Sequence, residues 1–551
     1  MFFLLLYANN YNKEYVSEDS IKIISFSPFG YEGALVAVEV DLRRGIPAVD
    51  LVGLADNAVK EARERMRVAI HNSGFEFPLE RVLISLSPAD VKKEGAGFDL
   101  PIALAVLQEK FVKDHVDKPE NDMCFDENVP ILVMGELELS GRIRPVRGVH
   151  AALSTAFENG IRCCIIPEEN APETAGLKHI KIFTVRHLEK AFQLFIALNN
   201  KSFFEKLNSD EKKSIIAQSQ SDDIEFPETS GTFDYSDVRG QADFLRALQV
   251  AAAGLHNIMA YGPPGCGKTL ALQHFADLLP LLTEEDALPV TRIYSLAGKL
   301  QAGTKLVREA PFRMPHQSSS LEGMIGGGPL CRPGEISLAH NGVLFLDEAS
   351  EFRSSVLQTL RVPLEDGKIT LSRAGRNTEF PARFQLLVAS NPCPCGNFGS
   401  QEKICLCSAR SVEQFWRKFS APLLDRLDIR VALGKADFDK SDSQKNYRVI
   451  STDELRKEIK KATRIQRSRQ GKSNSRLNPT EIKLFCQTDE QSERYLHSQS
   501  LRYGFSARGL HCCLKLARTI ADMAESSLIQ FSHIEEAVFL HRNDGGAGFM
   551  F

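Results

Sequence analysis

The order of hydrophobic and polar residues predicts alternating strands and helices over residues 21–199. Ala34–Val40 and Val82–Ser87 are aliphatic runs typical of strands, whereas Asp56–Ser73 and Ala151–Asn159 repeat apolar residues with the helical period. We therefore expect an α/β domain in this part of the chain. It contains neither a glycine-rich phosphate loop nor a cluster of acidic residues.

The rest of the chain divides into three segments that differ in composition and predicted secondary structure. Residues 200–232 are rich in Ser, Asp, Lys and Gln, which is typical of a solvated linker. Residues 233–433 alternate strands and helices again, and we expect a second α/β domain there. Asp453–Ala537 is mostly helix-forming, with a strong apolar period over Ser506–Glu525, and we expect residues 434–551 to form a helical domain.

Length and charge narrow the class of protein. The chain has 551 residues, which is too long for a single hydrophobic core. Its 67 Lys and Arg residues are balanced by 71 Asp and Glu residues, giving a net charge of −4. This balance excludes a polycation that simply coats nucleic acid, but it allows a local basic channel.

The first residues, Met1–Tyr7, are apolar but few, and no positive charge precedes them. We expect residues 1–20 to be an unstructured extension or the result of a misplaced start codon, rather than a signal peptide. No run of about 18 or more apolar residues occurs in the sequence, so we expect a cytoplasmic protein with no membrane partner.

A phosphate-binding loop is present in the second α/β part. The pattern G-x-x-x-x-G-K-[ST] is satisfied by Gly262–Thr269, between the apolar run Ile258–Tyr261 and the helical run Leu270–Leu279. Glycines let successive N–H groups face a phosphate, while Lys268 suits the β- and γ-phosphates and Thr269 suits Mg²⁺. We therefore expect ATP and Mg²⁺ as cofactors. The loop residues are Gly262, Pro263, Pro264, Gly265, Cys266, Gly267, Lys268 and Thr269.

Two further strands end in polar residues that suit nucleotide hydrolysis. The buried strand Gly342–Leu346 is followed by Asp347 and Glu348. Asp347 suits the magnesium shell, and Glu348 suits the polarisation of the attacking water. The strand Phe384–Ala389 ends near Asn391, whose amide can orient that water against the γ-phosphate. A surface acidic pair and a turn asparagine are the alternatives.

Two arginines complete the candidate catalytic residues. Arg426 lies in the segment Pro422–Asp428, past the core sheet, and Arg508 opens the last long predicted helix. A guanidinium that projects into a neighbouring subunit's site stabilises charge on the transferred phosphoryl group, as an arginine finger does. A structural ion pair is the alternative for each arginine.

Four of the 12 cysteines are grouped as C-x-C-x9-C-x-C. Cys393, Cys395, Cys405 and Cys407 follow Asn391 closely, and their number and pairing are typical of a structural zinc site. The spacing is tighter than the usual C-x2-C, and four reduced loop thiols are the alternative. Most of the other cysteines are expected to be reduced residues of the core.

Six further motifs occur in order along the chain, in addition to the P-loop and the Asp–Glu strand. They are Ser236–Gln241, Phe312–His316, Arg332–His340, Pro363–Gly367, Asn391–Gly396 and Pro422–Asp428. Over residue 21 to about residue 542, this combination closely resembles the ComM/YifB family, the magnesium-chelatase-like AAA+ ATPases. The departures are small. Gln317 stands where a second His is usual, and Ala349-Ser350 replaces a Leu-Pro pair.

The resemblance implies a fold and an assembly. The fold is α/β: a P-loop AAA+ core with a C-terminal helical lid, preceded by a ribosomal-S5-domain-2-like α/β domain of the kind found in Lon proteases. The implied roles are Lys268 and Thr269 in Walker A, Asp347 and Glu348 in Walker B, Asn391 as sensor 1, Arg426 as the trans arginine finger and Arg508 as sensor 2. A finger supplied in trans requires a neighbour, so the resemblance implies a homohexameric ring.

The N-terminal domain is expected to lack protease activity despite its resemblance to Lon. Lon needs a Ser–Lys dyad. The segment that corresponds to the nucleophile, Lys93–Ala103, contains no serine. The segment that corresponds to the lysine, Pro145–His150, has His150 in its place. Without nucleophile and base, we expect no peptide cleavage.

A basic hairpin suggests what the ring encloses. Asp366–Arg376 alternates basic and apolar residues, and in the related clade that includes the MCM helicases such a hairpin projects into the pore. Copies of Lys368, Arg373 and Arg376 would give a channel the charge to bind DNA without sequence preference. A solvated hairpin is the alternative. A second basic stretch, Arg456–Arg476, is interpreted as an exposed helix face.

The leading functional hypothesis is an ATP-driven translocase or helicase that acts on single-stranded or branched DNA. The resemblance implies branch migration in recombination and natural transformation. The alternative is a chelatase-type or protein-remodelling ATPase without a DNA substrate, although the chain has no integrin-like partner domain. A nucleotide-gated scaffold with little turnover is a third hypothesis.

Overall fold

The structure is a computed structural model of the chain. It divides into two compact units: the first comprises residues 1–220 and 291–306, and the second comprises residues 221–290 and 307–551. The division passes through helix α8 (Glu284–Ala297), which the sequence pattern does not predict. The extension 1–20 and most of the linker 200–232 lie outside the described residues. Those residues are 23–89, 91–115, 130–177, 180–198, 224–228, 231, 233–300, 304–373, 376–398, 403–434 and 450–542.

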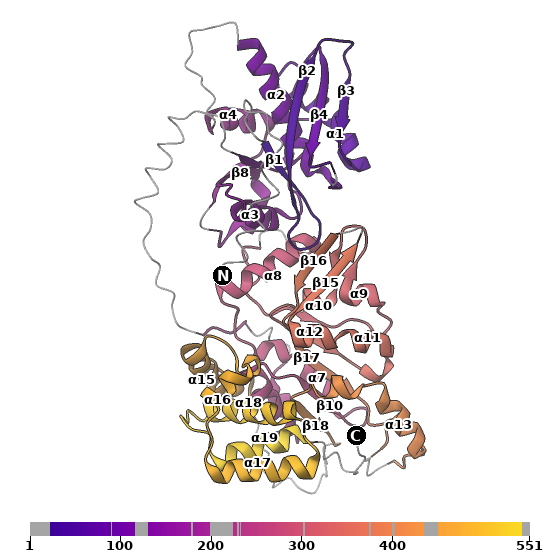
Figure 1. The fold of residues 1–551 in the computed structure, drawn as a ribbon, viewed down its shortest axis with the longest axis vertical. Helices are drawn as coiled ribbons and strands as arrows, with labels where there is room; N and C mark the ends of the chain where they lie inside the picture. The colour runs from indigo at the N-terminus through magenta and orange to yellow at the C-terminus, as the bar shows by residue number, and fades with distance from the viewer. Residues whose placement is uncertain are drawn as a thin grey trace. The chain divides into compact units, whose positions relative to one another are not determined.

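The first unit is built on a mixed sheet with the strand order β3-β4-β2-β1-β5-β8-β9, drawn in indigo to magenta in Figure 1. β1 is antiparallel to β2 and parallel to β5, and β8 and β9 continue the parallel sense. The strands are β1 (Ile23–Ser27), β2 (Ala34–Arg43), β3 (Val49–Val52), β4 (Arg81–Ser87), β5 (Ile131–Val133), β8 (Cys163–Pro167) and β9 (Lys181–Val185), beside a short hairpin of β6 (Glu136–Leu137) and β7 (Ile143–Arg144).

The helices of the first unit are α1 (Asn57–Asn72), α2 (Asp99–His115), α3 (Val149–Glu158) and α4 (Leu188–Leu198). The Asp56 side chain begins α1 by accepting a hydrogen bond of 2.8 Å from the Val59 N–H. β2, β4, α1 and α3 confirm the two strands and two helices predicted from the hydrophobic pattern, with bounds that differ by a few residues.

The sheet of the second unit is parallel throughout, with the order β11-β14-β17-β10-β18. All residues of β14 and β17 are buried, because helices cover both faces of such a sheet. β14 and β17 confirm the strands predicted before Asp347 and Asn391. The strands are β10 (Ile258–Tyr261), β11 (Phe312–Arg313), β14 (Val343–Leu346), β17 (Gln385–Ser390) and β18 (Ile429–Ala432).

Helices and two hairpins surround this sheet. The predicted helix Leu270–Leu279 is interrupted, because α7 ends at Gln273 and a 3₁₀ turn follows that buries Phe275 and Leu278 in the core. The helices are α6 (Ala242–Gly254), α7 (Lys268–Gln273), α9 (Leu321–Ile325), α10 (Glu335–Leu338), α11 (Ser354–Thr359), α12 (Arg361–Asp366), α13 (Ala409–Arg417) and α14 (Ala421–Leu424), and the hairpins pair β12 (Gly326–Gly327) with β13 (Arg332–Pro333) and β15 (Lys368–Arg373) with β16 (Arg376–Pro381).

From residue 450 onward the described chain is helical, as predicted. The helices, gold to yellow in Figure 1, pack side by side. α18 shows the expected period, since Cys512, Leu516 and Ile520 are buried at four-residue spacing on one face. They belong to the same hydrophobic core as the parallel strands. The helices are α15 (Thr452–Gln470), α16 (Pro479–Phe485), α17 (Glu490–Tyr503), α18 (Ala507–Met523) and α19 (Phe531–His541).

Each helix in the described part of the chain is too short or too polar to cross the hydrocarbon core of a membrane.

Candidate nucleotide site

The parallel sheet brings the three predicted nucleotide motifs to one edge. β17 lies between β10 and β14, with Ser390 paired to Tyr261 and Val388 paired to Leu346. Because the strands run in the same direction, the segments that follow them emerge together. These segments are the P-loop after β10, the Asp347–Glu348 pair after β14 and Asn391 after β17.

The P-loop curls around the side chain of Lys268. Gly265 and Gly267 have φ angles of 81° and 84°, a left-handed conformation that side chains with a Cβ rarely adopt. Lys268 is buried, and its ammonium donates to the carbonyl oxygens of Gly262 at 2.6 Å and Pro263 at 2.9 Å. The structure therefore holds a positive charge inside a loop of backbone groups, which is the arrangement that binds phosphate oxygens.

Thr269 and Asp347 form a pair of oxygen ligands suited to magnesium. The Thr269 hydroxyl donates to the Asp347 carboxylate at 3.1 Å, although the two residues are 78 positions apart in the sequence. The same carboxylate oxygen accepts the backbone N–H of Glu348 at 3.0 Å. Mg²⁺ is held in such sites by one or two protein oxygens while its other ligands come from water and phosphate, so this donor set fits the ion.

Glu348 has an unusual backbone and a defined side-chain partner. Its φ of 48° and ψ of 46° place it in the left-handed region, which costs free energy for a residue other than glycine. The Gln317 amide donates to its carboxylate at 2.7 Å. Gln317 follows β11, which pairs with β14. The residue that replaces the family's usual second His therefore contacts the predicted catalytic carboxylate directly.

Asn391 emerges between the P-loop and the acidic pair. Ser390, the last residue of β17, is buried, and its hydroxyl donates to the Asn391 carbonyl at 3.0 Å. The backbone N–H of Gly262 in turn donates to the Ser390 carbonyl at 3.3 Å. The start of the P-loop is thus tied to the end of the strand that carries Asn391.

The charges of Arg426 and Arg508 both act on one carboxylate, that of Glu365. Arg426 forms an ion pair with Glu365 and donates to the Pro422 carbonyl at 2.6 Å. The hydrogen bond from Arg426 lowers the pKa of Glu365, and the charge of the exposed Arg508 lowers it further. The sequence predicts a role for each arginine but does not predict that both charges act on the same carboxylate.

A buried polar network ties α18 to the strand after Arg426. Asp428 accepts from the Cys512 thiol at 2.9 Å and from the Asn257 backbone N–H at 3.0 Å, and it lies 3.5 Å from the His256 ring. Burial raises the pKa of Asp428, but the interaction with the His256 ring, together with the hydrogen bonds from Cys512 and Asn257, outweighs burial and lowers it to about 2. Ser506, the residue that caps α18, donates to Asp425 at 2.9 Å. Helix α18, whose second residue is Arg508, is therefore held against the segment that carries Arg426.

The four grouped cysteines converge in space. All four Sγ atoms lie within 4.8 Å of one another. Cys393 is buried, whereas Cys395 is exposed. A hydrogen bond from the Asn397 backbone is the main cause that lowers the pKa of Cys395 to about 6. The thiols are free rather than joined as disulfides, so the cluster has the composition of a metal site.

The predicted basic hairpin is present, but one of its charges is paired. β15 and β16 form an antiparallel ladder from Lys368–Pro381 to Arg373–Arg376. The Lys368 ammonium contacts the Glu379 carboxylate at 2.8 Å across the ladder, with both side chains half exposed. Arg373 is exposed, and the Arg376 side chain and the tip of the hairpin lie outside the described residues.

The second basic stretch lies mainly on α15, and several of its arginines turn inward. Arg456 donates to the Asp277 carbonyl at 2.8 Å, and Arg469 forms an ion pair of 2.6 Å with Asp522. Arg476 is largely buried, and that burial lowers its pKa. These contacts explain much of the positive charge of residues 456–476 as part of the fold.

In the first unit, Lys93 and His150, which lie in the two segments expected to correspond to the Lon dyad, are buried. Lys93 has no exposed surface and donates to the Pro88 carbonyl. His150 is 1% exposed, and burial, helped by the charge of Arg292, lowers its pKa to about 4. A neutral histidine enclosed in this way has no access to a peptide substrate.

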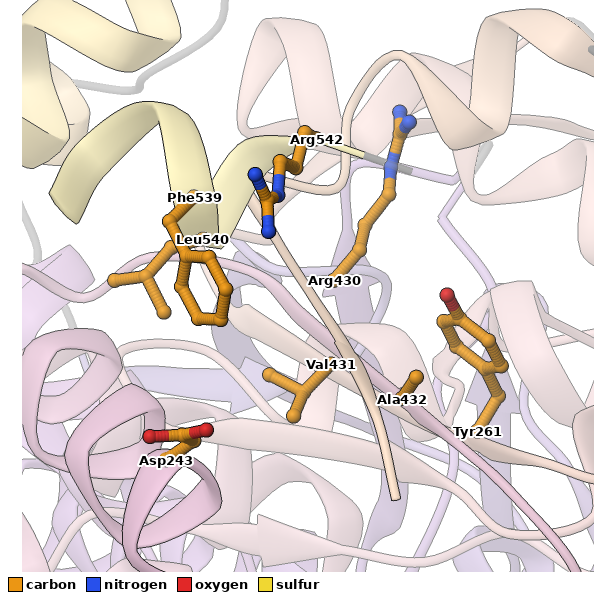
Figure 2. Close-up of a pocket in the computed structure, with 8 residues that line it drawn as sticks. All are labelled: Asp243, Tyr261, Arg430, Val431, Ala432, Phe539, Leu540 and Arg542. Carbon is orange, nitrogen blue, oxygen red and sulfur yellow. The ribbon is translucent and has the colours of Figure 1, made fainter. Parts of the chain in front are cut away.

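A small pocket beside the start of the P-loop was not predicted from the sequence. It has a volume of about 110 Å³ and lies where β10 and β18 end, next to α19 (Figure 2). Phe539 and the Arg542 guanidinium, 4.5 Å from its ring centroid, lie across from Tyr261. Such aromatic and guanidinium groups suit a planar base. Its lining residues are Asp243, Tyr261, Arg430, Val431, Ala432, Phe539, Leu540 and Arg542.

Comparison with protein families finds three matching segments, all from one subunit of magnesium chelatase. The model "Magnesium chelatase, subunit ChlI" matches residues 234–441. The model "Subunit ChlI of Mg-chelatase" matches residues 38–170, and "Magnesium chelatase, subunit ChlI C-terminal" matches residues 449–541. The first and third matches span the parallel sheet and the C-terminal helices.

Individual relatives match over nearly the whole chain. The chain is 36% identical to the protein YifB of Escherichia coli (strain K12) over 515 residues, which cover 92% of this chain and 94% of YifB. It is 35% identical to the competence protein ComM of Haemophilus influenzae over 519 residues, covering 94% and 96% of the two chains. A shorter match, 29% identical over 161 residues, covers 27% of this chain and 28% of Lon protease 2 of Bacillus subtilis.

Proposed function

This chain belongs to the ComM/YifB family of magnesium-chelatase-like AAA+ ATPases, and from that premise we propose that it is an ATP-hydrolysing motor that moves along DNA. The observation that carries the proposal is the meeting of Lys268, Asp347 and Asn391 at one edge of a parallel sheet. Binding alone would need only the P-loop, whereas hydrolysis also needs a carboxylate and an amide beside it.

The roles of the side chains follow from their positions. Backbone N–H groups of the P-loop and the Lys268 ammonium would bind the phosphates, and Thr269 and Asp347 would hold Mg²⁺, which would supply positive charge to offset that of the phosphates. Glu348 accepts a proton from the attacking water, and Asn391 orients that water. ATP and Mg²⁺ are thus the cofactors of this proposal, and the four clustered cysteines are its zinc site.

We propose that the active site is shared between subunits of a homohexameric ring. Arg426 forms an ion pair with Glu365, the charge of Arg508 also acts on that carboxylate, and the hydrogen bond from Ser506 to Asp425 joins the two segments that carry these arginines. A neighbouring subunit's nucleotide would attract both guanidinium groups away from Glu365. Arg426 then acts as the finger and Arg508 as sensor 2, each stabilising charge on the phosphoryl group.

The proposal includes the domain organisation. Residues 21–199 form an S5-like, Lon-protease-like domain without protease activity, in accord with the burial of Lys93 and His150. A linker at 200–232 leads to the AAA+ core at 233–433, and residues 434–551 form the helical lid. We place the protein in the cytoplasm, where its DNA substrate is found.

DNA is the proposed substrate because of the β15–β16 hairpin. Copies of Arg373 and Lys368 around a ring would attract phosphates without reading sequence. The relative ComM is named a competence protein. We propose that this chain promotes branch migration in recombination and natural transformation, with single-stranded or branched DNA as its partner.

One observation favours a second candidate function. Lys368 is paired with Glu379, so the hairpin offers less free positive charge than its sequence suggests. Together with the match to a magnesium chelatase subunit, this supports a remodelling ATPase that acts on a protein partner instead of DNA.

DNA-stimulated ATP hydrolysis distinguishes the two functions. At low salt, we expect branched or single-stranded DNA to raise the ATPase rate of the wild type, and the double variant Lys368→Ala/Arg373→Ala to lose that response. The control variant Lys457→Ala/Arg464→Ala removes two exposed charges from α15 and should respond like the wild type. A rate that DNA leaves unchanged in every protein would favour the remodelling ATPase.

A further inference from the structure

The cysteine cluster lies between two segments of the nucleotide site. Its first half follows Asn391 directly, and its second half ends at Ser408, whose side chain caps α13. The cluster therefore joins the end of β17 to α13. The described parts of this connection are residues 391–398 and 403–408.

The sulfur positions fit a tetrahedral metal ion. The Sγ–Sγ distances are 3.4 Å between Cys393 and Cys395, 3.7 Å between Cys393 and Cys405, and 3.6 Å between Cys395 and Cys405. Four sulfurs at about 2.3 Å from a zinc ion lie about 3.8 Å apart, so little movement is needed to bind one. A disulfide would require about 2 Å instead.

Backbone groups around the sulfurs support the same assignment. The Phe398 N–H donates to the Cys393 sulfur at 3.3 Å, and the Asn397 N–H donates to the Cys395 sulfur. Such N–H groups stabilise thiolates and orient them towards a metal, as outer partners do in metal sites. The carbonyl of Cys393 also accepts the Gly396 N–H at 3.0 Å, which closes a tight turn.

This turn packs closely against the P-loop. Gly396 has a φ of 74°, and a Cβ added to it would lie 3.0 Å from Cδ of Pro264. The backbone of the cysteine turn is therefore in contact with a residue of the phosphate-binding loop. Only a residue without a Cβ allows the two segments to approach this closely.

Helix α13, which follows the cluster, and the residue after it also contact segments next to the nucleotide site. The Trp416 indole donates to the Pro392 carbonyl at 3.1 Å and packs edge-on against Tyr261, with ring centroids 5.7 Å apart. Tyr261 is the last residue before the P-loop. Lys418 donates to the Ser350 carbonyl at 2.7 Å, two residues beyond Glu348.

We propose that Cys393, Cys395, Cys405 and Cys407 bind one Zn²⁺ ion, and that this metal knuckle is a positioning element that holds the P-loop ready for ATP. The metal would cross-link residues 391–398 to residues 403–408 through four sulfur atoms. Loss of that cross-link would loosen the position of the Gly396 turn against Pro264. ATP affinity then depends on zinc. This inference rests on the proposed function of Gly262–Thr269 as the ATP site.

The test measures zinc and ATP binding separately on the full chain. Zinc is quantified by elemental analysis after purification under reducing conditions, and affinity is measured by titration with a fluorescent ATP analogue. We expect about one zinc ion per wild-type chain, and loss of zinc with at least tenfold weaker ATP binding in Cys405→Ser/Cys407→Ser. The variant Cys486→Ala removes a buried cysteine outside the cluster and should keep both properties.

A second variant tests the contact while leaving all four cysteines in place. Gly396→Ala introduces the Cβ that meets Pro264, so we expect retained zinc and several-fold weaker ATP binding. Gly471→Ala has a similar left-handed φ of 70° but open space around the added Cβ, so it should bind ATP like the wild type. Thermal unfolding of each variant reports whether the fold is intact.

Three results would overturn the inference. They are a wild-type chain without zinc after growth in zinc-supplemented medium, zinc-free Cys405→Ser/Cys407→Ser that binds ATP as tightly as the wild type, and a Gly396→Ala variant with unchanged affinity. Failure of the proposed function looks different. In that case Lys268→Ala and the wild type bind ATP equally well or not at all, while the zinc content of both is unaffected.

Discussion

The Gln317 side-chain amide donates a hydrogen bond of 2.7 Å to the Glu348 carboxylate. The bond joins the segment after β11 to the residue after β14, and Glu348 is held in a left-handed backbone conformation at the same point. A carboxylate oxygen occupied by an amide is less able to accept a proton from water. The bond therefore restrains the group that we propose as the general base.

Removing this bond should raise the basal ATPase rate. A hydrogen bond to a charged group contributes about 1.5–3 kcal/mol when buried, and less at an exposed carboxylate such as Glu348. We expect Gln317→Ala to hydrolyse ATP about threefold to tenfold faster than the wild type without DNA, measured by phosphate release. Gln193→Ala, which removes a similar amide–carboxylate bond on α4, is the control. A slower Gln317→Ala enzyme would show that the bond positions Glu348 rather than restrains it.

Binding and hydrolysis should be separable at the acidic pair and the P-loop. Glu348→Gln removes the proton acceptor but keeps the side-chain volume, so we expect ATP binding like the wild type and a rate of hydrolysis lower by at least about 10²-fold. Lys268→Ala should lose binding itself. Equal hydrolysis by Glu348→Gln and the wild type would support a scaffold with little turnover in place of a motor.

A shared active site predicts complementation between variants. Neither Arg426→Ala nor Lys268→Ala should hydrolyse ATP alone, because each lacks one half of every site. In a mixed ring, a Lys268 from an Arg426→Ala subunit can meet an Arg426 from a Lys268→Ala subunit. We therefore expect mixing to restore part of the ATPase rate, and Arg508→Ala to behave like Arg426→Ala in the same assay. Mixtures without any gain would contradict a finger supplied in trans.

Much of this site could be predicted because short sequence patterns identify its elements. The P-loop and the strands before Asp347 and Asn391 need only short-range patterns, and parallel pairing then brings them together. The ion pairs of Arg426 and Lys368 could not be predicted, because Glu365 is remote in sequence from Arg426 and Glu379 is recognisable as a partner only when the hairpin register is known.

Two other features needed the structure for different reasons. The contact between Gly396 and Pro264 depends on close approach of two loops, which leaves no periodic signal. The assignment of residues 291–306 to the first unit depends on contacts such as the 2.9 Å bond from Arg292 to Thr155. Arginines are frequent on surfaces, so nothing in the sequence marks this one as buried.

The buried His150 predicts how stability depends on pH. Burial lowers its pKa from 6.5 to about 4, so the unfolded chain binds a proton at pH 5 that the folded chain does not. The contribution of His150 to the free energy of unfolding is therefore fully present above pH 6.5, and it falls as the pH drops from 6.5 to about 4. One pKa unit corresponds to about 1.4 kcal/mol, so the shift at His150 should lower the free energy of unfolding by about 2 kcal/mol between pH 7 and pH 5.

Urea unfolding at pH 7 and pH 5 measures this contribution. His150→Leu should lose less stability between the two pH values than the wild type does. His71→Leu, which changes a solvent-exposed histidine on α1, should keep the pH dependence of the wild type. An unchanged pH dependence in His150→Leu would show that another group is responsible.

Branch migration on a synthetic four-way DNA junction tests the central claim most directly. With ATP and Mg²⁺, the wild type is expected to convert the junction into two forked duplexes, while Glu348→Gln with ATP, and the wild type without ATP, leave it intact. Lys368→Ala/Arg373→Ala should hydrolyse ATP at the basal rate but fail to move the junction. A wild-type chain that hydrolyses ATP yet neither binds nor moves the junction at low salt would contradict the account of a DNA motor.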